Sequence, residues 1–314
     1  MFDPETFISE ADRHLDIIDG KTIIACSGGV DSTAAAVLAS RRLGDDLLAV
    51  FIDTGFMRKD EPEEVDALLT RMGVNHMIVD SSSIFYSRLE SVCEPEAKRK
   101  IIGNVFIEEF ERIANKWGAK FLIQGTIAPD WIESGGELRD VIKSHHNVGG
   151  LPEKFGLVLV EPLRDLYKDE VRQLARYLGC EVAERQPFPG PGLAIRIMGE
   201  ATKESADIVR EACHIVETEL EKAASQNEME LPWQYFAVLL PVKTVGVHGD
   251  VRAYGYTVAV RAVQSIDGMT AAYSKIPHDV LERISIRITN TMGSRVNRVV
   301  YDVTNKPPGT IEWE

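Results

Sequence analysis

The chain has 314 residues, enough for two ordinary domains, and 44% of them are hydrophobic, so a substantial core can form. No stretch is long and apolar enough to span a membrane, and the acidic start lacks the apolar region of a secretory signal, so the sequence predicts a cytoplasmic protein with no membrane partner. A formal net charge of −14 argues against a nucleic-acid partner, and four cysteines without a Cys-x-x-Cys pair exclude a conventional zinc site and indicate reduced thiols.

The first half of the chain alternates short apolar runs with longer amphipathic stretches. Strands are predicted over 22–26, 47–52, 76–79, 120–124 and 157–160. Helices are predicted over 61–72, 97–117 and 168–178, and an alanine-rich helix follows the first strand. This alternation predicts an α/β fold in which a parallel sheet carries helices on both faces.

The segment Ser27-Gly28-Gly29-Val30-Asp31-Ser32 joins the first strand to the alanine-rich helix. Its glycines let the backbone approach a phosphate, and the free amides at a helix start point toward an anion. Ser27 and Ser32 add hydroxyl donors, whereas an ionised Asp31 cannot donate and is better suited to a magnesium ion shared with phosphates. The loop matches neither a Walker A motif nor the dinucleotide fingerprint, and a glycine turn without a ligand is the alternative interpretation.

Two further positions follow predicted strands at the edge where α/β sheets bind their ligands. Asp53, in Asp53-Thr54-Gly55, ends the second strand and is suited to a ribose hydroxyl, although a turn-forming Asp before a glycine is the alternative. Gly125 follows the fourth strand in the same way. Both are therefore predicted to lie at the nucleotide.

Residues 130–152 contain several glycines and little apolar periodicity, and a loop of this length inside a compact domain is typical of a functional lid. Chemistry on ATP needs carboxylates that hold metal and cations that stabilise charge on the phosphates and on the attacked oxygen. The lid offers such groups in Asp130, Glu133, Lys143, His145 and His146. On spacing alone, a solvated polar loop is the alternative to a lid that closes and excludes water.

A segment rich in proline and glycine, 186–192, cannot form a regular element and marks a domain boundary. We predict a first domain over 1–187, a linker over 188–200 and a second domain over 201–314. In the second domain, helices are predicted over 203–223 and 277–290, and strands over 234–240, 256–260 and 296–303. This pattern predicts an α+β domain with a small sheet.

The last residues, 306–314, combine a rigid Pro-Pro, a glycine and an apolar Ile-x-Trp pair with the phosphate-seeking Lys306. Chain ends are usually frayed and have no special composition, so rigid and apolar residues at this end are unusual. It suits a small anionic ligand, and a closing strand with a polar tip is the alternative interpretation.

These segments occur together in one family, and the chain resembles the ATP pyrophosphatase part of GMP synthetase over essentially its whole length. The resemblance rests on the Ser27–Ser32 loop and on 142–152, 188–194, 245–250 and 306–314. The loop alone is shared by all ATP pyrophosphatases, whose fold is adenine-nucleotide α-hydrolase-like, whereas the other segments together are specific to this enzyme. The resemblance implies that a smaller α+β dimerisation domain follows the parallel sheet.

The resemblance implies a carbon–nitrogen ligase of GMP biosynthesis that uses ATP, Mg²⁺ and xanthosine 5′-monophosphate (XMP). The purine O2 attacks the α-phosphate of ATP and releases pyrophosphate, and ammonia then attacks C2 of adenyl-XMP and releases AMP. The implied roles are pyrophosphate and metal binding for Ser27–Ser32, metal or catalytic roles for Asp130 and Glu133, charge stabilisation for Lys143, and lid closure or catalysis for His145 and His146. The implied XMP ligands are Lys306 and Thr310 near the phosphate, Ile311, and Glu312 near the base or ribose.

Many family members carry an amidotransferase domain ahead of this region, and no cysteine here lies in a nucleophile-elbow context. The chain therefore resembles the two-subunit form, typical of archaea, in which a separate glutamine amidotransferase subunit supplies ammonia. A homodimer through the second domain is also implied. The alternatives are another ATP pyrophosphatase, such as NAD synthetase or a tRNA-modifying ligase, and a nucleotide-binding subunit without catalysis. The substrate that triggers pyrophosphate release separates the enzymes, and ATP binding without turnover indicates the last.

Overall fold

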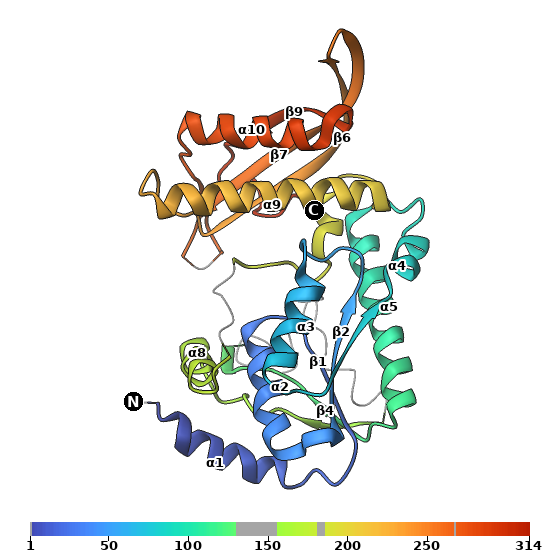
Figure 1. Cartoon of the computed structure of the whole chain (residues 1–314), viewed down its shortest axis with the longest axis vertical. Coiled ribbons are helices and arrows are strands. Elements are labelled where there is room, and N and C mark those ends of the chain that lie inside the picture. Colours follow the sequence, from blue (N-terminus) through green and yellow to red (C-terminus); the bar gives the residue numbers. More distant parts are fainter. Residues whose placement is uncertain (1, 130–155, 181–185, 267) are drawn as a thin grey trace. The chain divides into compact units, whose positions relative to one another are not determined.

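A computed structural model describes residues 2–129, 156–180, 186–266 and 268–314 (Figure 1). The chain divides into two compact units. The first holds Met1–Thr54, Asp60–Ser81 and Asn104–Glu184, and the second holds Gly55–Lys59, Ser82–Gly103 and Arg185–Glu314. The second unit therefore takes in two segments from the N-terminal half, which the order of the predicted elements does not reveal. The domain limits at 187 and 200 stay predictions.

The described part of the first unit contains a five-stranded sheet in the order β3-β2-β1-β4-β5. Neighbouring strands all pair in parallel, and the strands are β1 (Thr22–Ala25), β2 (Leu47–Asp53), β3 (His76–Asp80), β4 (Phe121–Ile123) and β5 (Val158–Val160). Thr22 lies opposite Leu47 of β2 and Phe121 of β4. β1 takes this central place because its residues Thr22, Ile23 and Ile24 are all buried. The predicted α/β class and parallel sheet are confirmed.

Helices cover this sheet on both faces because right-handed crossovers return to it in two directions. The path from β1 through β2 to β3 places α2 (Val30–Leu43) and α3 (Glu61–Arg71) on one face. The return from β3 to β4 places α5 (Pro95–Trp117) on the other. α1 (Pro4–Leu15) and α8 (Lys168–Tyr177) pack on α2, whose small, buried residues allow this close approach.

The second unit is built around a long hairpin of β6 (Gln234–His248) and β7 (Val251–Gln264), drawn in orange in Figure 1. β9 (Val296–Tyr301) pairs in parallel with β7, and β8 (Ala272–Tyr273) pairs antiparallel with the same strand. α9 (Lys203–Ser225) packs on β6, and α10 (His278–Met292) packs on α9 and β9. The expected small sheet with helices is confirmed, and the short α4 (Ser82–Arg88) belongs to this unit as well.

The hairpin extends further than the sequence analysis predicts. The predicted strand over 234–240 stops before Pro241 because proline cannot donate a ladder hydrogen bond. The structure places Pro241 at a register shift between Leu240 and Lys243, after which pairing resumes and continues to His248 opposite Val251. A β-bulge of this kind takes the proline out of the ladder, so both strands are longer than predicted.

The predicted linker over 188–200 also contains more structure than expected. A short 3-10 helix, η2 (Gly192–Arg196), begins directly after Pro191, and all of its residues are buried. Gly192 has φ +64°, and a Cβ atom there would overlap the carbonyl group of Phe56. The predicted linker is therefore packed into the second unit from η2 onward.

The described residues include every cysteine of the chain as a free thiol. Cys26, Cys180 and Cys213 are buried, and Cys93 is exposed. Within the same described residues, no helix is long and apolar enough to cross a membrane.

Candidate functional site

The turn that follows β1 is shaped by its two glycines. The ladder of β1 continues to Cys26, whose N–H donates to the Val50 carbonyl at 2.8 Å. Gly28 then has φ +76°, and a Cβ atom there would lie 2.8 Å from Cγ2 of Val65, so only glycine fits without displacement. Gly29 is the N-cap of α2 and brings no side chain to it. The backbone at the start of α2 is therefore open to a ligand.

Hydrogen-bond donors gather at the same turn. The first helical hydrogen bond of α2 runs from the Thr33 N–H to the Gly29 carbonyl at 3.1 Å. The N–H groups of residues 30–32 precede it and have no partner within the helix. The hydroxyls of Ser27 and Ser32 lie 3.1 Å apart, and the Ser32 hydroxyl also accepts from the Ser27 N–H at 3.1 Å. These donors at a helix N-terminus suit a phosphate group.

Asp31 has one oxygen paired and one oxygen without a partner. Its Oδ2 accepts from the ammonium of Lys168 at 2.5 Å. Its Oδ1 is buried and has no hydrogen-bond partner among the described residues. A buried acceptor without a donor is destabilising, so this oxygen is suited to a cation delivered with a ligand. Mg²⁺ fits that description because it takes one or two carboxylate oxygens together with phosphate oxygens and water.

Lys168 is a site residue that the sequence analysis missed. It is the first residue of α8, where its positive charge opposes the helix dipole. A lysine at the first position of a helix therefore indicates that its charge is stabilised by a partner outside the helix. The partner, Asp31, is 137 residues away in the chain, so the pair itself cannot be seen in the sequence.

The end of β4 lies directly beside the turn after β1. A Cβ atom at Gly125 would come within 3.1 Å of the backbone of Asp31 and Ser32, so glycine permits this close approach. The side-chain oxygens of Gln124 (Oε1) and Thr126 (Oγ1) are buried and have no hydrogen-bond partner in the part of the chain that the structure describes. In the strand order β3-β2-β1-β4-β5 the connections reverse direction between β1 and β4, and ligands of such sheets bind at this switch point.

Asp53 is placed at the same carboxyl edge, at the end of β2. Its carbonyl accepts from the Ser81 N–H at 3.0 Å, and the residue is half-buried. Its contact with a ribose stays a prediction. Beside the turn, burial raises the pKa of the Cys26 thiol, so this cysteine is a neutral packing residue and not a nucleophile.

The predicted ligand residues of the chain end lie together in the second unit. The Lys306 ammonium donates to the Gly268 carbonyl at 2.8 Å, and its backbone pairs with Ala271. The Thr310 hydroxyl donates to the Glu312 carbonyl, and Ile311 is buried. The segment is therefore folded against the unit, and the alternative of a frayed end does not apply.

Three buried cations hold this terminal segment, and the sequence analysis missed all of them. Arg261 donates to the carbonyls of Thr310 at 2.9 Å and Ile311 at 3.4 Å, and it also contacts Asp302 at 3.3 Å. The other two are Arg196, which pairs with Glu312, and Lys98, which pairs with Glu314. A signal was present for Arg261 and Arg196, since each interrupts an otherwise apolar buried run, and a buried charge needs a partner.

The predicted lid residues Asp130, Glu133, Lys143, His145 and His146 lie outside the described residues. Among the residues that are described, no cluster of three or more His, Cys, Asp or Glu side chains is arranged to hold a metal ion. The metal assignment within the described part of the chain therefore rests on Asp31.

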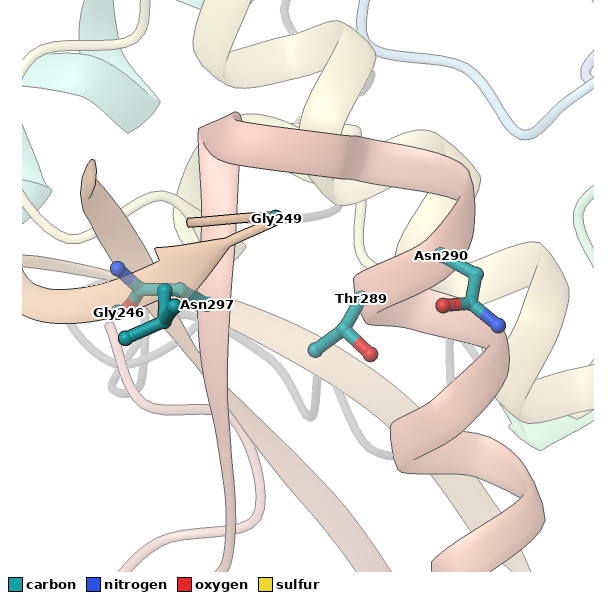
Figure 2. A pocket seen from close by; sticks show the side chains of 6 residues that line it. Gly246, Gly249, Thr289, Asn290 and Asn297 are labelled. Atoms are coloured by element: carbon teal, nitrogen blue, oxygen red, sulfur yellow. The ribbon is translucent and has the colours of Figure 1, made fainter. Parts of the chain in front are cut away.

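A separate hollow of about 330 Å³ lies in the second unit, and Figure 2 shows the residues that line it. Gly246 and Gly249 come from the hairpin, Thr289 and Asn290 from α10, and Asn297 from β9. The Asn297 amide donates to the Thr244 carbonyl at 2.8 Å, and a Cβ atom at Gly246 would lie 2.7 Å from this side chain. Asn297 thus packs β9 against the hairpin, and no predicted site residue lines the hollow.

Two family models match the chain. One is described as the GMP synthase C terminal domain and matches residues 218–313. The other is described as NAD synthase and matches residues 14–108, which include the Ser27–Ser32 loop. The two matches fall on the two halves that the sequence analysis distinguishes.

Curated proteins named as the B subunit of GMP synthase (glutamine-hydrolyzing) are similar to the whole chain. The relative from Thermococcus kodakarensis is 59% identical over 99% of both chains. The relative from Thermoplasma acidophilum is 57% identical over 95% of this chain and 94% of the relative, and that from Methanopyrus kandleri is 56% identical over 100% of both. Among solved structures, NMN synthetase from Francisella tularensis aligns with a TM-score of 0.47 and 17% identity over 61% of this chain and 78% of that chain.

Proposed function

The chain belongs to the family of GMP synthase B subunits, and we propose on this basis that it is the synthetase subunit that makes GMP from XMP, ATP and ammonia. The structural observation that carries the proposal is the donor-rich turn Ser27–Ser32 beside a buried, unpartnered Asp31 oxygen, at the switch point of the sheet. Such an arrangement suits the phosphates of a nucleotide together with a metal ion.

The reaction proceeds in two displacements. The O2 oxygen of XMP attacks the α-phosphorus of ATP, and the bond to the β-phosphate breaks with release of pyrophosphate. Ammonia then attacks C2 of adenyl-XMP, AMP departs with the former O2, and the new amino group loses one proton to solvent. The protein contributes orientation and charge stabilisation to both steps.

We assign the pyrophosphate of ATP to the turn Ser27–Ser32 and the sugar and base to the edge formed by Asp53 and Gly125. Asp31 would hold Mg²⁺, and the ion would neutralise charge that develops on the phosphates. The Lys168 ammonium donates to Oδ2 of Asp31, which would leave Oδ1 for the ion. ATP as a substrate follows from the family, and the metal is our proposal.

We assign the chemistry at the α-phosphate to the segment 130–152. Asp130 and Glu133 are proposed as metal or catalytic carboxylates, and Lys143 as the cation that stabilises charge on the α-phosphate and O2. His145 and His146 are proposed to support closure or catalysis. These roles come from the sequence motif.

We assign XMP to the terminal segment of the second unit. Lys306 and Thr310 are proposed to bind its phosphate, and Ile311 and Glu312 its base and ribose. Support comes from the anchoring of this segment by Arg196 and Arg261, which gives its side chains a defined place without a ligand.

The name of the relatives implies a partner subunit that hydrolyses glutamine, and we propose that such a glutaminase supplies ammonia to this chain in the cytoplasm. We also propose a homodimer through the second unit. Support comes from one face of the hairpin β6–β7, where Val247 is 71% exposed, Tyr254 is 69% exposed and Val245, which lies opposite Tyr254, is 49% exposed. Exposed apolar side chains that share one face are typical of an interface. Light scattering of the purified chain tests this, and a monomer at micromolar concentration contradicts it.

The nitrogen source tests the proposed function. The purified chain is incubated with ATP, Mg²⁺ and XMP, and GMP is measured with ammonium chloride or with glutamine. We expect GMP with ammonium and none with glutamine. GMP from glutamine would contradict the need for a partner, and no GMP from either source would contradict the substrate assignment.

A further inference from the structure

The carboxylate of Glu312 is held by a forked set of donors. Arg196 donates from Nη2 to Oε1 at 2.8 Å and from Nε to Oε2 at 3.1 Å. Gln234 donates from Nε2 to the same Oε1 at 2.9 Å. A bidentate guanidinium–carboxylate pair fixes the plane of the carboxylate as well as its position, which a single hydrogen bond cannot do.

Arg196 is itself held in one orientation. Its residue is 0% exposed, and its guanidinium lies 4.1 Å from the ring centre of Phe236 and 5.2 Å from that of Phe188. Its Nη1 lies 4.0 Å from Sγ of Cys213. Burial acts to lower the pKa of Arg196, but the Glu312 carboxylate raises it, so the guanidinium stays charged. Glu312 is therefore oriented by a buried, charged group that its neighbours hold in place.

The second ion pair of the terminal segment provides a contrast. Lys98 lies 2.5 Å from Glu314, and the two side chains are 0% and 2% exposed, so no ligand can reach this pair. In the Arg196–Glu312 pair the arginine side chain is 1% exposed, whereas that of Glu312 is 18% exposed. The same segment thus contains one sealed pair and one pair whose carboxylate keeps an accessible edge.

The accessible edge of Glu312 has a defined chemistry. A carboxylate has about four acceptor positions, and three of those on Glu312 are used by Arg196 and Gln234. The guanidinium and the amide can only donate here, so the free position is an acceptor. It is suited to an N–H or O–H donor of a ligand.

We propose that Arg196 is a positioning residue for XMP, which acts through Glu312 by fixing the carboxylate so that its free edge accepts a hydrogen bond from the base or ribose. This inference rests on the proposed function, because it takes XMP as the ligand of the terminal segment. Arg196 itself does not touch the nucleotide.

A double-mutant cycle tests the inference. The variants are Arg196→Lys, Glu312→Gln and their combination, and the readouts are kcat, KM for XMP and KM for ATP. Because lysine keeps the charge and loses the fork, Arg196→Lys is expected to raise KM for XMP about tenfold, with KM for ATP unchanged. In the Glu312→Gln background, Arg196→Lys is expected to have no further effect, since the residue through which it acts is already altered.

A matched control separates positioning from stability. Arg287 of α10 lies 2.5 Å from Glu219, a buried carboxylate of α9 in the same unit, so this pair ties two helices together. Arg287→Lys is expected to lower the melting temperature while leaving KM for XMP unchanged. If Arg196→Lys does not fold, Phe236→Leu replaces it in the cycle, because it loosens the guanidinium without removing it.

The outcomes separate the inference from the function on which it rests. If the wild-type chain shows no XMP-dependent pyrophosphate release, the proposed function is wrong and the inference falls with it. If the wild type is active but the effects of Arg196→Lys and Glu312→Gln on KM for XMP are additive, the function stands and the positioning role is wrong. Non-additive effects confined to KM for XMP support the inference.

Discussion

The turn at Ser27–Ser32 and the terminal segment 306–314 are two candidate ligand sites built in different ways. The turn is made by consecutive residues, and its shape follows from Gly28 at φ +76° and from the start of α2 at Val30. The terminal segment is shaped by Lys98, Arg196 and Arg261, which come from α5, η2 and β7. A local site can be recognised in the sequence, whereas a site held by distant cations becomes visible only in the fold.

This contrast predicts that the terminal segment depends most on its sealed ion pair. Lys98→Met leaves the Glu314 carboxylate buried without its ion-pair partner, and such a change costs about 3–5 kcal/mol, or about 10 °C in the melting temperature. Differential scanning calorimetry measures this shift. The combination of Lys98→Met with Glu314→Gln removes both charges and is expected to recover most of the loss. An unchanged midpoint in the single variant contradicts the proposed anchoring.

The turn is expected to be most sensitive to a substitution that strains its backbone. Gly28→Ala introduces a Cβ atom 2.8 Å from Val65 at a positive φ, which strains the loop by about 1–3 kcal/mol and is expected to lower XMP-dependent pyrophosphate release at least about tenfold. Gly73 is a matched control in the same unit, because its φ is +67° and a Cβ atom added there would meet nothing within 4 Å. Gly73→Ala is expected to keep full activity. Equal losses in both variants would mean that the turn has no special geometric role.

A substitution at Asp31 is expected to change the Mg²⁺ dependence of the activity more than the melting temperature. Asp31→Asn replaces the charged carboxylate by a neutral amide, which is a weaker ligand for a cation. The Mg²⁺ concentration for half-maximal activity is therefore expected to rise about tenfold. Asp169→Asn provides the control, since this side chain is 85% exposed and follows Lys168 in the sequence. A Mg²⁺ dependence that stays the same in Asp31→Asn removes Asp31 from the metal site.

The smallest effects are expected on the alkylation rates of the cysteines. Cys26 lies beside the turn and Cys213 lies beside Arg196, so their rates report on the two sites. Burial raises the pKa of Cys213, next to Arg196, to about 11, and it also raises the pKa of Cys26 beside the turn. Since the thiolate is the reactive form, alkylation at pH 8 is expected at the exposed Cys93 first, and the rate at Cys213 is expected to rise as the pH approaches 11. The pKa of the Cys213 thiol is higher in the folded chain than in the unfolded chain. The stability of the folded chain is therefore unaffected by this thiol below about pH 8.5 and falls as the pH rises toward 11.

Peptide mass spectrometry of the alkylated chain completes this test. ATP is expected to slow the labelling of Cys26 a few fold, and XMP that of Cys213, with Cys93 as the internal control. Protection of Cys213 by ATP and of Cys26 by XMP would mean that the two ligands are assigned to the wrong sites.

The sequence predicts most of the strands and helices because each is a continuous apolar or amphipathic run, but it does not predict α1, α4 or β8. It predicts the turn because the chemistry of six neighbouring residues is complete in itself. It does not predict the contacts of Asp31 with Lys168, of Glu312 with Arg196 or of Glu314 with Lys98, whose partners are separated by 137, 116 and 216 residues. It also ends β6 too early, because a proline at a β-bulge looks like the end of a strand.

The first displacement can be measured without a nitrogen donor. The purified chain is mixed with ATP and Mg²⁺, with and without XMP, and pyrophosphate is followed within a single turnover in the absence of ammonium and glutamine. We expect a burst of about one pyrophosphate per active site that requires XMP, since adenylation precedes the arrival of ammonia. Pyrophosphate release that does not depend on XMP, or none at all, would contradict the assignment of the two sites to ATP and XMP.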